Sequence, residues 1–293
     1  MKKHIIITLL PLFFLGIAAN CGAVLAYDIW EGRDMPGNKS LQQDKTTQQN
    51  GRIRVEVLNS PRIEFYKADS DKPCGAVIVC PGGGYKVMCW DYEGTDIAES
   101  LAKNGISAFV LAYRVPDNRN GALMDAQRAI RYIRAHAKDF NINPDKVAIM
   151  GFSAGGNLSA RCANGKDSYK LSDAIDKFSA LPNYTGLIYP AYLNKPNEDG
   201  YEKEVSEEKY DTRYELSPHI FVDKKTPSSF LVSTGEDYCI DASIAYYLAL
   251  KKAGVPACLH LFDKGKHGFA ADKKNLVSQW FDLYVKWLKH NGF

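Results

Sequence analysis

The sequence predicts an α/β fold with a mainly parallel sheet. Short apolar runs with the length of buried strands alternate with longer segments whose apolar residues recur at the helical period. This alternation is typical of right-handed β-α-β crossovers, which place helices on both faces of a parallel sheet. A chain of 293 residues is long enough for one large domain of this kind.

The expected elements follow in chain order. Residues 52–58 alternate like a half-buried strand, and residues 62–67 suggest its hairpin partner, which would add antiparallel strands at one edge. The long, charged segment 192–226 predicts an insertion above the sheet. Buried strands are expected at residues 76–80, 108–113, 147–150, 186–189, 229–233 and 257–262, and helices at residues 95–103, 123–137, 155–163, 240–253 and 275–289.

The N-terminus predicts a signal peptide over residues 1–26. Two lysines precede an apolar run, and small residues follow it, with cleavage expected after Ala26 or after Ala23. Cys21 leaves open a lipid anchor, although Asn20 is a poor residue before a modified cysteine. We therefore expect a secreted or periplasmic protein without a membrane span after cleavage, an extended lead-in over residues 27–50 and a catalytic domain over residues 51–293.

The composition disfavours several classes of partner and cofactor. The net charge is only +3, and a nearly neutral chain is not suited to nucleic acid or to an anionic membrane surface. Six of the seven cysteines remain after cleavage, an even number that permits disulfides but leaves their pairing open. Neither a C-x-x-C nor an H-E-x-x-H spacing occurs, so we expect no metal or other cofactor. The oligomeric state cannot be derived from the sequence.

The stretch "GFSAG", residues 151–155, matches the G-x-S-x-G pattern between a predicted strand and a predicted helix. In that position the pattern holds a serine on a strained turn with its hydroxyl exposed. Ser153 is therefore a candidate nucleophile. The pattern alone is weak evidence, because it also occurs by chance in loops.

A serine hydroxyl needs a histidine that takes its proton and an acid that orients the histidine. His267, in "DKGKHGF", follows the last predicted strand and lies between two glycines. Asp237 follows the strand 229–233 and is the favoured acid, with Glu236 as the alternative. Asp241 is better placed as the N-cap of the helix that follows.

Backbone N–H groups must also receive the negative charge of the tetrahedral intermediate. The stretch "PGGGY", residues 81–85, follows the strand 76–80, and its glycines allow a close approach to a substrate. We expect Gly83, Gly84 and Ala154 to donate to the oxyanion.

The order Ser153, Asp237, His267 is the order of the α/β-hydrolases. The sequence resembles α/β-hydrolase serine esterases, and more narrowly the secreted acetylxylan-esterase-like and feruloyl-esterase-like carbohydrate esterases. The resemblance covers roughly residues 77–269 and rests on "VIVCPGGGY", "EG", "AYRVP", "INPDKVAIMGFSAGGNLSA" and "GKHGF". It implies a mainly parallel eight-stranded sheet with helices on both faces, the triad Ser153, Asp237 and His267, and oxyanion donors in Gly83, Gly84 and Ala154.

The resemblance implies a secreted serine carboxylesterase that deacetylates xylan or xylo-oligosaccharides through an acyl-enzyme on Ser153. A feruloyl or other small-acyl esterase is the alternative. A peptidase of the prolyl-oligopeptidase type is disfavoured, because it normally carries a propeller domain and the residues before Arg52 leave no room for one. A non-catalytic carbohydrate-binding protein is disfavoured, because it would not need the triad. Tyr85, Trp90 and Tyr92 are candidates for stacking on sugar rings, with ordinary packing as the alternative. Glu93 near a helix start is expected to complement the helix dipole.

Overall fold

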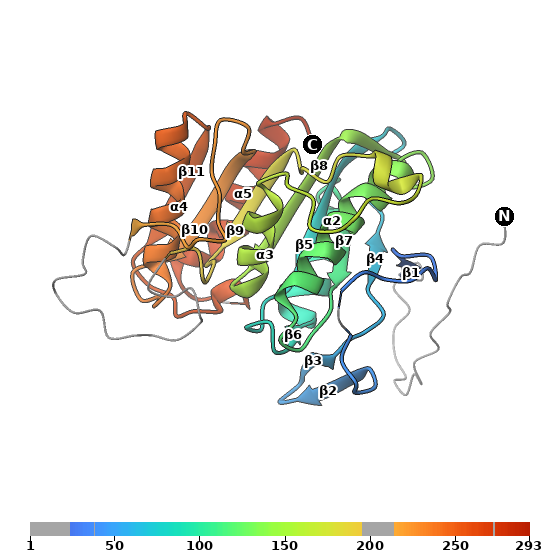
Figure 1. Cartoon of the computed structure of the whole chain (residues 1–293). Helices are drawn as coiled ribbons and strands as arrows, with labels where there is room; N and C mark the ends of the chain where they lie inside the picture. Colours follow the sequence, from blue (N-terminus) through green and yellow to red (C-terminus); the bar gives the residue numbers. More distant parts are fainter. Residues whose placement is uncertain (1–23, 38, 195–213, 272) are drawn as a thin grey trace.

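The computed structural model describes residues 24–37, 39–194, 214–271 and 273–293. Its main feature is an eight-stranded sheet with the strand order β1-β4-β7-β5-β8-β9-β10-β11 (Figure 1). From β7 to β11 every neighbouring pair is parallel, whereas β4 is antiparallel to both β1 and β7. The predicted α/β class with a mainly parallel sheet is confirmed. The strands of this sheet are β1 (Leu25–Asp28), β4 (Arg62–Tyr66), β5 (Cys74–Cys80), β7 (Ser107–Ala112), β8 (Ile142–Phe152), β9 (Tyr184–Ile188), β10 (Ser228–Thr234) and β11 (Ala257–Phe262).

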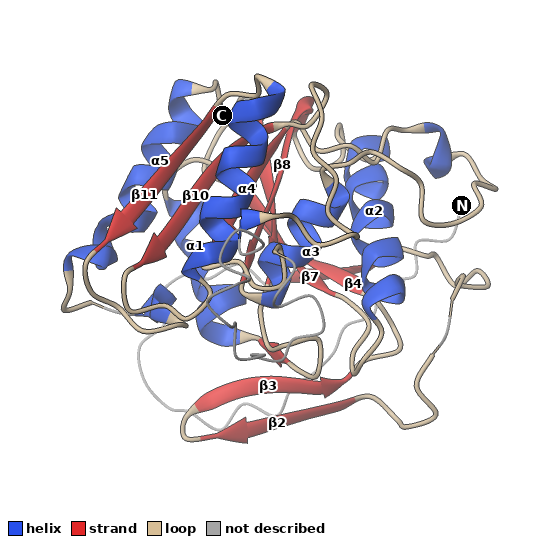
Figure 2. Ribbon diagram, turned by 60° about the vertical axis from the view of Figure 1, so that its left-hand side comes forward, coloured by secondary structure: helices blue, strands red, loops and turns tan. Residues whose placement is uncertain are grey.

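Helices cover both faces of the sheet (Figures 1 and 2). On β10, Phe230 packs against Tyr284 of α5, whereas the next residue, Leu231, belongs to a cluster with Tyr246 of α4. Because successive side chains of a strand point to opposite faces, α4 and α5 lie on opposite sides of the sheet. The helices are α1 (Asp96–Lys103), α2 (Arg119–Ala135), α3 (Ala154–Cys162), α4 (Ile240–Ala253) and α5 (Trp280–His290), the last preceded by a short 3₁₀ turn, Leu276–Gln279.

The predicted hairpin of residues 52–58 with residues 62–67 is wrong. The strand β3 (Arg52–Val57) pairs instead with β2 (Lys45–Gln49) and β6 (Met88–Cys89) in a separate three-stranded sheet. Asn50 and Gly51 both have positive φ and connect β2 to β3. Asn-Gly is the sequence signal of a two-residue hairpin turn, so the reversal lies before residue 52.

The predicted lead-in, residues 27–50, is part of the folded domain. Its first residues extend β1, which pairs with β4 at the edge of the main sheet. Trp30 is 2% exposed, and its indole N–H donates to Asp125 at 3.0 Å. Too few apolar residues occur here to produce a period, although Ile29 and Trp30 are buried. The domain boundary at residue 51 is therefore wrong, and cleavage after Ala26 would cut inside β1.

The remaining expectations fall partly outside the described residues. The signal peptide lies there up to residue 23, as do residues 195–213 of the predicted insertion. Within the described chain the six cysteines are free thiols, so none of them forms a disulfide with another. None of the described helices has the length and hydropathy that crossing a membrane requires.

Candidate active site

Ser153 lies on the sharp turn between β8 and α3. Its φ is +50°, a strained conformation for a residue with a side chain, and its backbone N–H donates to the Ile188 carbonyl at 3.1 Å. A Cβ atom on Gly151 would lie 2.1 Å from the Gly155 oxygen, and one on Gly155 would lie 2.1 Å from the Cys80 oxygen. The turn therefore requires both glycines of the G-x-S-x-G pattern on steric grounds.

Three side chains meet beyond the carboxyl ends of β8, β10 and β11. The Ser153 Oγ lies 2.8 Å from the His267 Nε2, and the His267 Nδ1 lies 2.8 Å from the Asp237 Oδ1. The Asp237 carboxylate is buried, whereas His267 keeps part of its surface exposed. The structure thus brings together the serine, histidine and acid that the sequence singled out, with the spacing of a nucleophile, a base and an orienting acid.

The two neighbouring acids have different partners. Asp237 also accepts the Cys239 N–H at 2.8 Å and the Ser233 hydroxyl at 3.2 Å, so its carboxylate is fixed from several sides. Glu236 instead accepts the N–H of Gly265 at 2.9 Å and supports the backbone of the histidine loop. The geometry favours Asp237 as the acid. Asp241 lies in the first turn of α4, whose N-cap is Cys239.

The glycine loop after β5 lies beside the serine turn. Gly83 and Gly84 have φ of +130° and +66°, and a Cβ atom on Gly83 would lie 2.2 Å from the Val87 oxygen. Within the described residues, the N–H groups of Gly83 and Gly84 donate to no protein atom. The N–H of Ala154 belongs to the first turn of α3, where helices leave N–H groups unpaired. These three donors are available for an oxyanion.

Comparison with known proteins places the chain in a family. Residues 64–188 match the BD-FAE family. An acetylxylan esterase of Xylanibacter ruminicola is 30% identical over 76% of the chain and 45% of its own length. An endo-1,4-beta-xylanase B of Butyrivibrio fibrisolvens is 30% identical over 75% of the chain and 36% of its own length. The chain thus spans less than half the length of these two curated relatives.

A solved structure matches over nearly its whole length. The acetyl ester-xyloside bifunctional hydrolase of Caldicellulosiruptor lactoaceticus has a TM-score of 0.74 and 31% identity, covering 92% of this chain and 96% of the other. The chain belongs to the α/β-hydrolase esterases. The predicted fold, the resemblance to acetylxylan esterases and the enzyme class of carboxylic ester hydrolases are confirmed at the level of this family.

Two of the aromatic residues proposed to stack on sugars are packed inside the esterase. Tyr85 is 1% exposed and donates its hydroxyl to Asn157 at 2.8 Å, and Trp90 is also buried. The ring of Tyr85 packs edge-on against Tyr113, and the Trp90 N–H donates to the Ile53 carbonyl of β3 at 3.0 Å. The expectation for Tyr85 and Trp90 is therefore wrong. Tyr92 is half-buried beneath the guanidinium of Arg52, 4.7 Å from its ring.

Other aromatic residues of the esterase surround His267. The ring of Tyr238 lies 4.5 Å from the imidazole and the residue is 62% exposed, while buried Tyr189 contacts the imidazole at 5.1 Å. Sequence reasoning missed both, although Tyr238 directly follows the triad acid. It also missed Glu93, whose carboxylate binds the glycine loop and Tyr189 instead of complementing a helix dipole.

A metal ion would compete with the triad of the esterase. The possible ligand atoms of Asp237, Cys239 and His267 lie within 4.8 Å of one another, which could accommodate a cation. The Asp237 carboxylate and the His267 ring already bond to each other, so a cation there would disrupt that contact. Nothing in this geometry requires a metal for catalysis.

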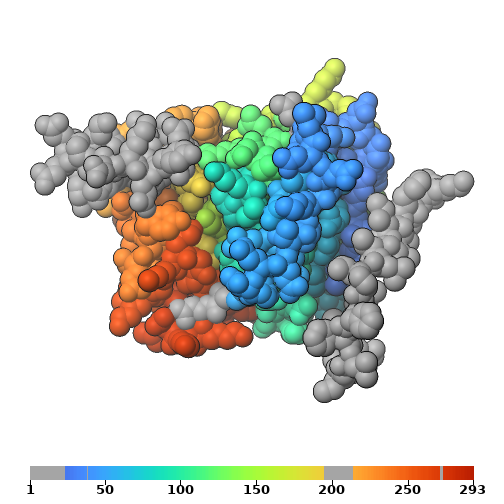
Figure 3. All heavy atoms as spheres, turned by 90° about the horizontal axis from the view of Figure 1, so that it is seen from below, coloured from blue at the N-terminus to red at the C-terminus, as the bar shows by residue number. Residues whose placement is uncertain are grey.

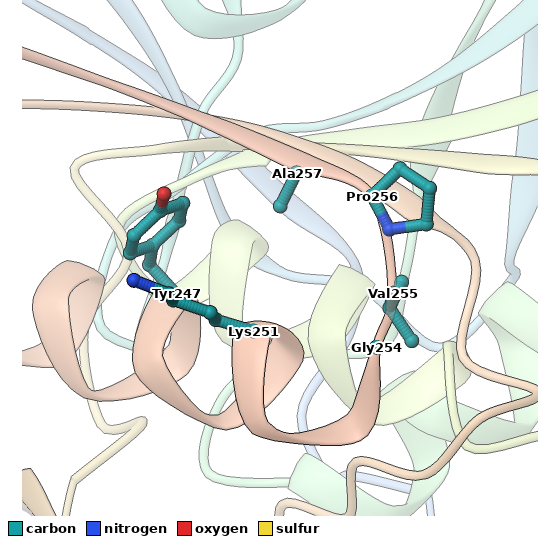
Figure 4. A pocket seen from close by; sticks show the side chains of 6 residues that line it. All are labelled: Tyr247, Lys251, Gly254, Val255, Pro256 and Ala257. Carbon is teal, nitrogen blue, oxygen red and sulfur yellow. The ribbon is translucent and has the colours of Figure 1, made fainter.

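The two ends of the parallel sheet have different surroundings in the esterase. Figure 3 looks at the end where β5 leads into the glycine loop, with the blue β2–β3 hairpin on one side and the orange and red C-terminal third on the other. A hollow of about 280 Å³ lies where α4 ends and β11 begins, and therefore at the opposite end of the sheet (Figure 4). It is lined by Tyr247, Lys251, Gly254, Val255, Pro256 and Ala257.

Proposed function

We propose that this esterase is a serine carboxylesterase that removes acetyl groups from xylan or xylo-oligosaccharides. The observation that carries the proposal is the hydrogen-bonded series from Ser153 through His267 to Asp237, beside the available N–H groups of the glycine loop. The substrate class is supported by the relatives, one named an acetylxylan esterase and one an acetyl ester-xyloside hydrolase.

The first half of the reaction acylates the serine. The His267 Nε2 takes the proton of Ser153 while the Ser153 Oγ forms a bond to the ester carbonyl carbon. Asp237 accepts the Nδ1–H and stabilises the imidazolium. The carbonyl oxygen becomes an oxyanion, which accepts hydrogen bonds from Gly83, Gly84 and Ala154. The bond to the sugar oxygen then breaks, and His267 returns the proton to that oxygen.

The second half releases the acid. Water takes the place of the sugar alcohol, and His267 removes a proton from this water. The water oxygen then attacks the carbonyl carbon of the acetyl group on Ser153. The same three N–H groups bind the second oxyanion. The bond to the Ser153 Oγ breaks, the proton returns to that oxygen, and acetate leaves. Every proton transfer uses His267, so no further cofactor is needed.

The test of the reaction is Ser153→Ala. We expect the variant to fold and to lose hydrolysis of p-nitrophenyl acetate by at least about 10³-fold in kcat. Retention of wild-type hydrolysis would reject Ser153 as the nucleophile. Labelling of Ser153 by a fluorophosphonate separates an esterase from a non-catalytic carbohydrate-binding protein.

The test of the substrate compares two polymers. Acetate release from acetylated xylan is expected to exceed ferulate release from feruloylated arabinoxylan at equal enzyme concentration. The opposite order would make the protein a feruloyl esterase.

We also propose that residues 1–23 are a signal peptide, with export as the consequence. Of the two cleavage points that the sequence suggests, the one after Ala23 leaves β1 whole, whereas the one after Ala26 removes half of it. N-terminal sequencing of the exported protein should give Val24, and Tyr27 would contradict this assignment.

A further inference from the structure

Glu93 is a buried acid that the proposed reaction does not use. It lies in the short π-helical turn Asp91–Thr95, between the glycine loop and α1, and is 3% exposed. Its Oε2 accepts the N–H of Gly82 at 2.8 Å, and its Oε1 accepts the hydroxyl of Tyr189 at 2.8 Å. A buried carboxylate persists only where such bonds offset its loss of hydration.

The first of these bonds holds the glycine loop. Gly82 directly precedes the two proposed oxyanion donors, and a Cβ atom on it would lie 2.7 Å from the Glu93 Oε2 and 3.1 Å from the Ser153 Cβ. The carbonyl of Gly82 in turn accepts the Cys89 N–H at 2.9 Å. With both its peptide groups engaged, Gly82 fixes the direction in which the chain enters Gly83.

The second bond reaches the histidine. Tyr189 follows β9, its N–H donates to the Val232 carbonyl at 2.8 Å, and its ring packs edge-on against the imidazole of His267. Glu93 therefore connects groups on both sides of Ser153: the loop that would bind the oxyanion and the ring that flanks the base.

We propose that Glu93 is a positioning residue of this site, whose carboxylate joins the glycine loop to Tyr189 and thereby sets the Gly83 and Gly84 N–H groups relative to His267. This inference rests on the proposed function. Oxyanion donors act only if they point to where charge develops, and a misplacement of about 1 Å can cost 10²-fold in rate. The competing explanation is an acid that serves stability alone.

The ionised form is the one that this geometry uses. Both carboxylate oxygens accept hydrogen bonds. A proton on Oε1 would make that oxygen a donor facing the Tyr189 hydroxyl, and the neutral acid would be a weaker acceptor for the Gly82 N–H. Burial raises the pKa of Glu93 to about 7, against the lowering effects of Tyr189, Gly82 and the nearby His267. Protonation in this range should weaken the link between the glycine loop and Tyr189. The titratable groups that interact with Glu93 are Cys89, Asp91, Tyr92, Tyr113, Tyr189 and His267.

The experiment is steady-state hydrolysis of p-nitrophenyl acetate by Glu93→Gln. The amide keeps the shape but turns one acceptor into a donor that faces an N–H or an O–H. We expect kcat to fall about 10- to 100-fold with KM within about twofold, because the lost alignment acts in the transition state. Glu99→Gln makes the same chemical change on the exposed face of α1 and should match the wild type.

Three further readouts separate positioning from stability. Tyr189→Phe keeps the ring beside His267 but removes the hydroxyl donor, and should lower kcat by a smaller factor. The wild-type pH profile of kcat/KM should contain an ionisation that Glu93→Gln lacks. Fluorophosphonate labelling of Ser153, measured on the folded fraction, should slow in both variants.

The inference is overturned if folded Glu93→Gln keeps kcat within twofold of the wild type, or if its pH profile keeps the wild-type shape. If Glu93→Gln does not fold, Tyr189→Phe serves as the test. A Tyr189→Phe variant with unchanged kcat and an unchanged pH profile would then overturn the inference. A wild-type protein that hydrolyses no ester would instead reject the proposed function, so the two failures are distinguishable.

Discussion

At the scale of single residues, the site depends on backbone positions as much as on side chains. Ser153 holds a positive φ because Gly151 and Gly155, two residues away on either side, let the chain turn sharply, and because its carbonyl accepts the N–H groups of Asn157 and Ala191, both at 3.1 Å. A strained residue persists where the surrounding structure over-determines it. The hydroxyl is therefore presented by the fold rather than by a flexible loop.

The adjacent acids Glu236 and Asp237 allow a matched comparison. Asp237→Asn should lower kcat about 10⁴-fold, because an amide cannot keep His267 in the required tautomer. Glu236→Gln keeps an oxygen that can accept the Gly265 N–H, so kcat should stay within about tenfold of the wild type. Both are measured on p-nitrophenyl acetate, and the reverse order of effects would make Glu236 the acid.

Glu93 also predicts a pH dependence of stability. Its folded-state pKa of about 7 exceeds its ordinary value of 4.5, so between these pH values the folded protein binds a proton that the unfolded chain has released. This contribution is complete below about pH 4.5 and is lost as pH rises through 7. The free energy of unfolding of the wild type, relative to that of Glu93→Gln, should therefore decrease by on the order of 3 kcal/mol between pH 4.5 and 8.

The measurement is urea unfolding of both proteins between pH 4.5 and 8. Titratable groups that do not interact with Glu93 contribute equally to both proteins, so their contributions cancel in the difference. A difference that does not change with pH would contradict the raised pKa. If the prediction holds, the form of the site that the proposed reaction uses is also the less stable form.

At the scale of elements, β1 and the residues after it stabilise the domain from its edge. Trp30 lies in the core and its indole reaches Asp125, which is fully buried and also paired with Arg114 at 2.9 Å. Removing one donor from a buried carboxylate leaves that carboxylate with a poorer set of partners. Trp30 lies only four residues after Ala26, so β1 and the residues that follow it are a structural element of the catalytic domain.

Trp30→Phe should lower the free energy of unfolding by about 1–3 kcal/mol while leaving kcat on p-nitrophenyl acetate unchanged. Trp287→Phe, in α5, removes the same atoms from a half-buried indole that donates no hydrogen bond within the described residues, and should cost less. Urea unfolding of the two variants checks this. Equal losses would mean that packing, not the bond to Asp125, gives Trp30 its effect.

The elements that sequence reasoning predicted are those with a strong pattern. Buried parallel strands are continuous apolar runs, and the predicted helix 240–253 coincides with α4, whose C-terminal end is marked by Gly254 with φ of +73°. The expected N-cap Asp241 lies instead inside the first turn, because the cap is Cys239. The strand β3 was predicted, but its partner β2 was missed because β2 is polar and mostly exposed, so only Asn50-Gly51 marks the hairpin. The burial of Tyr85 depends on contacts with Tyr113 and Asn157, and that of Trp90 on its place beside β3, none of which a local pattern reports.

At the scale of the whole molecule, the meeting of Ser153, His267 and Asp237 was predictable because each follows a strand end in a fixed order. Glu93 was not, since its role depends on a contact with Tyr189 across 96 residues of chain. A residue that acts through distant partners leaves no spacing in the sequence. The same limit applies to Tyr238, whose position over His267 is set by two different loops.

The parts of the site follow strands that are spread along the chain but lie within one part of the sheet, from β5 to β11. The glycine loop follows β5, the serine follows β8, the acid follows β10 and the histidine comes after β11. Contacts between such distant segments form slowly during folding, because each closes a large loop of chain. Ester hydrolysis cannot begin until the last of these strands has docked, so the appearance of activity marks the end of folding rather than any step before it.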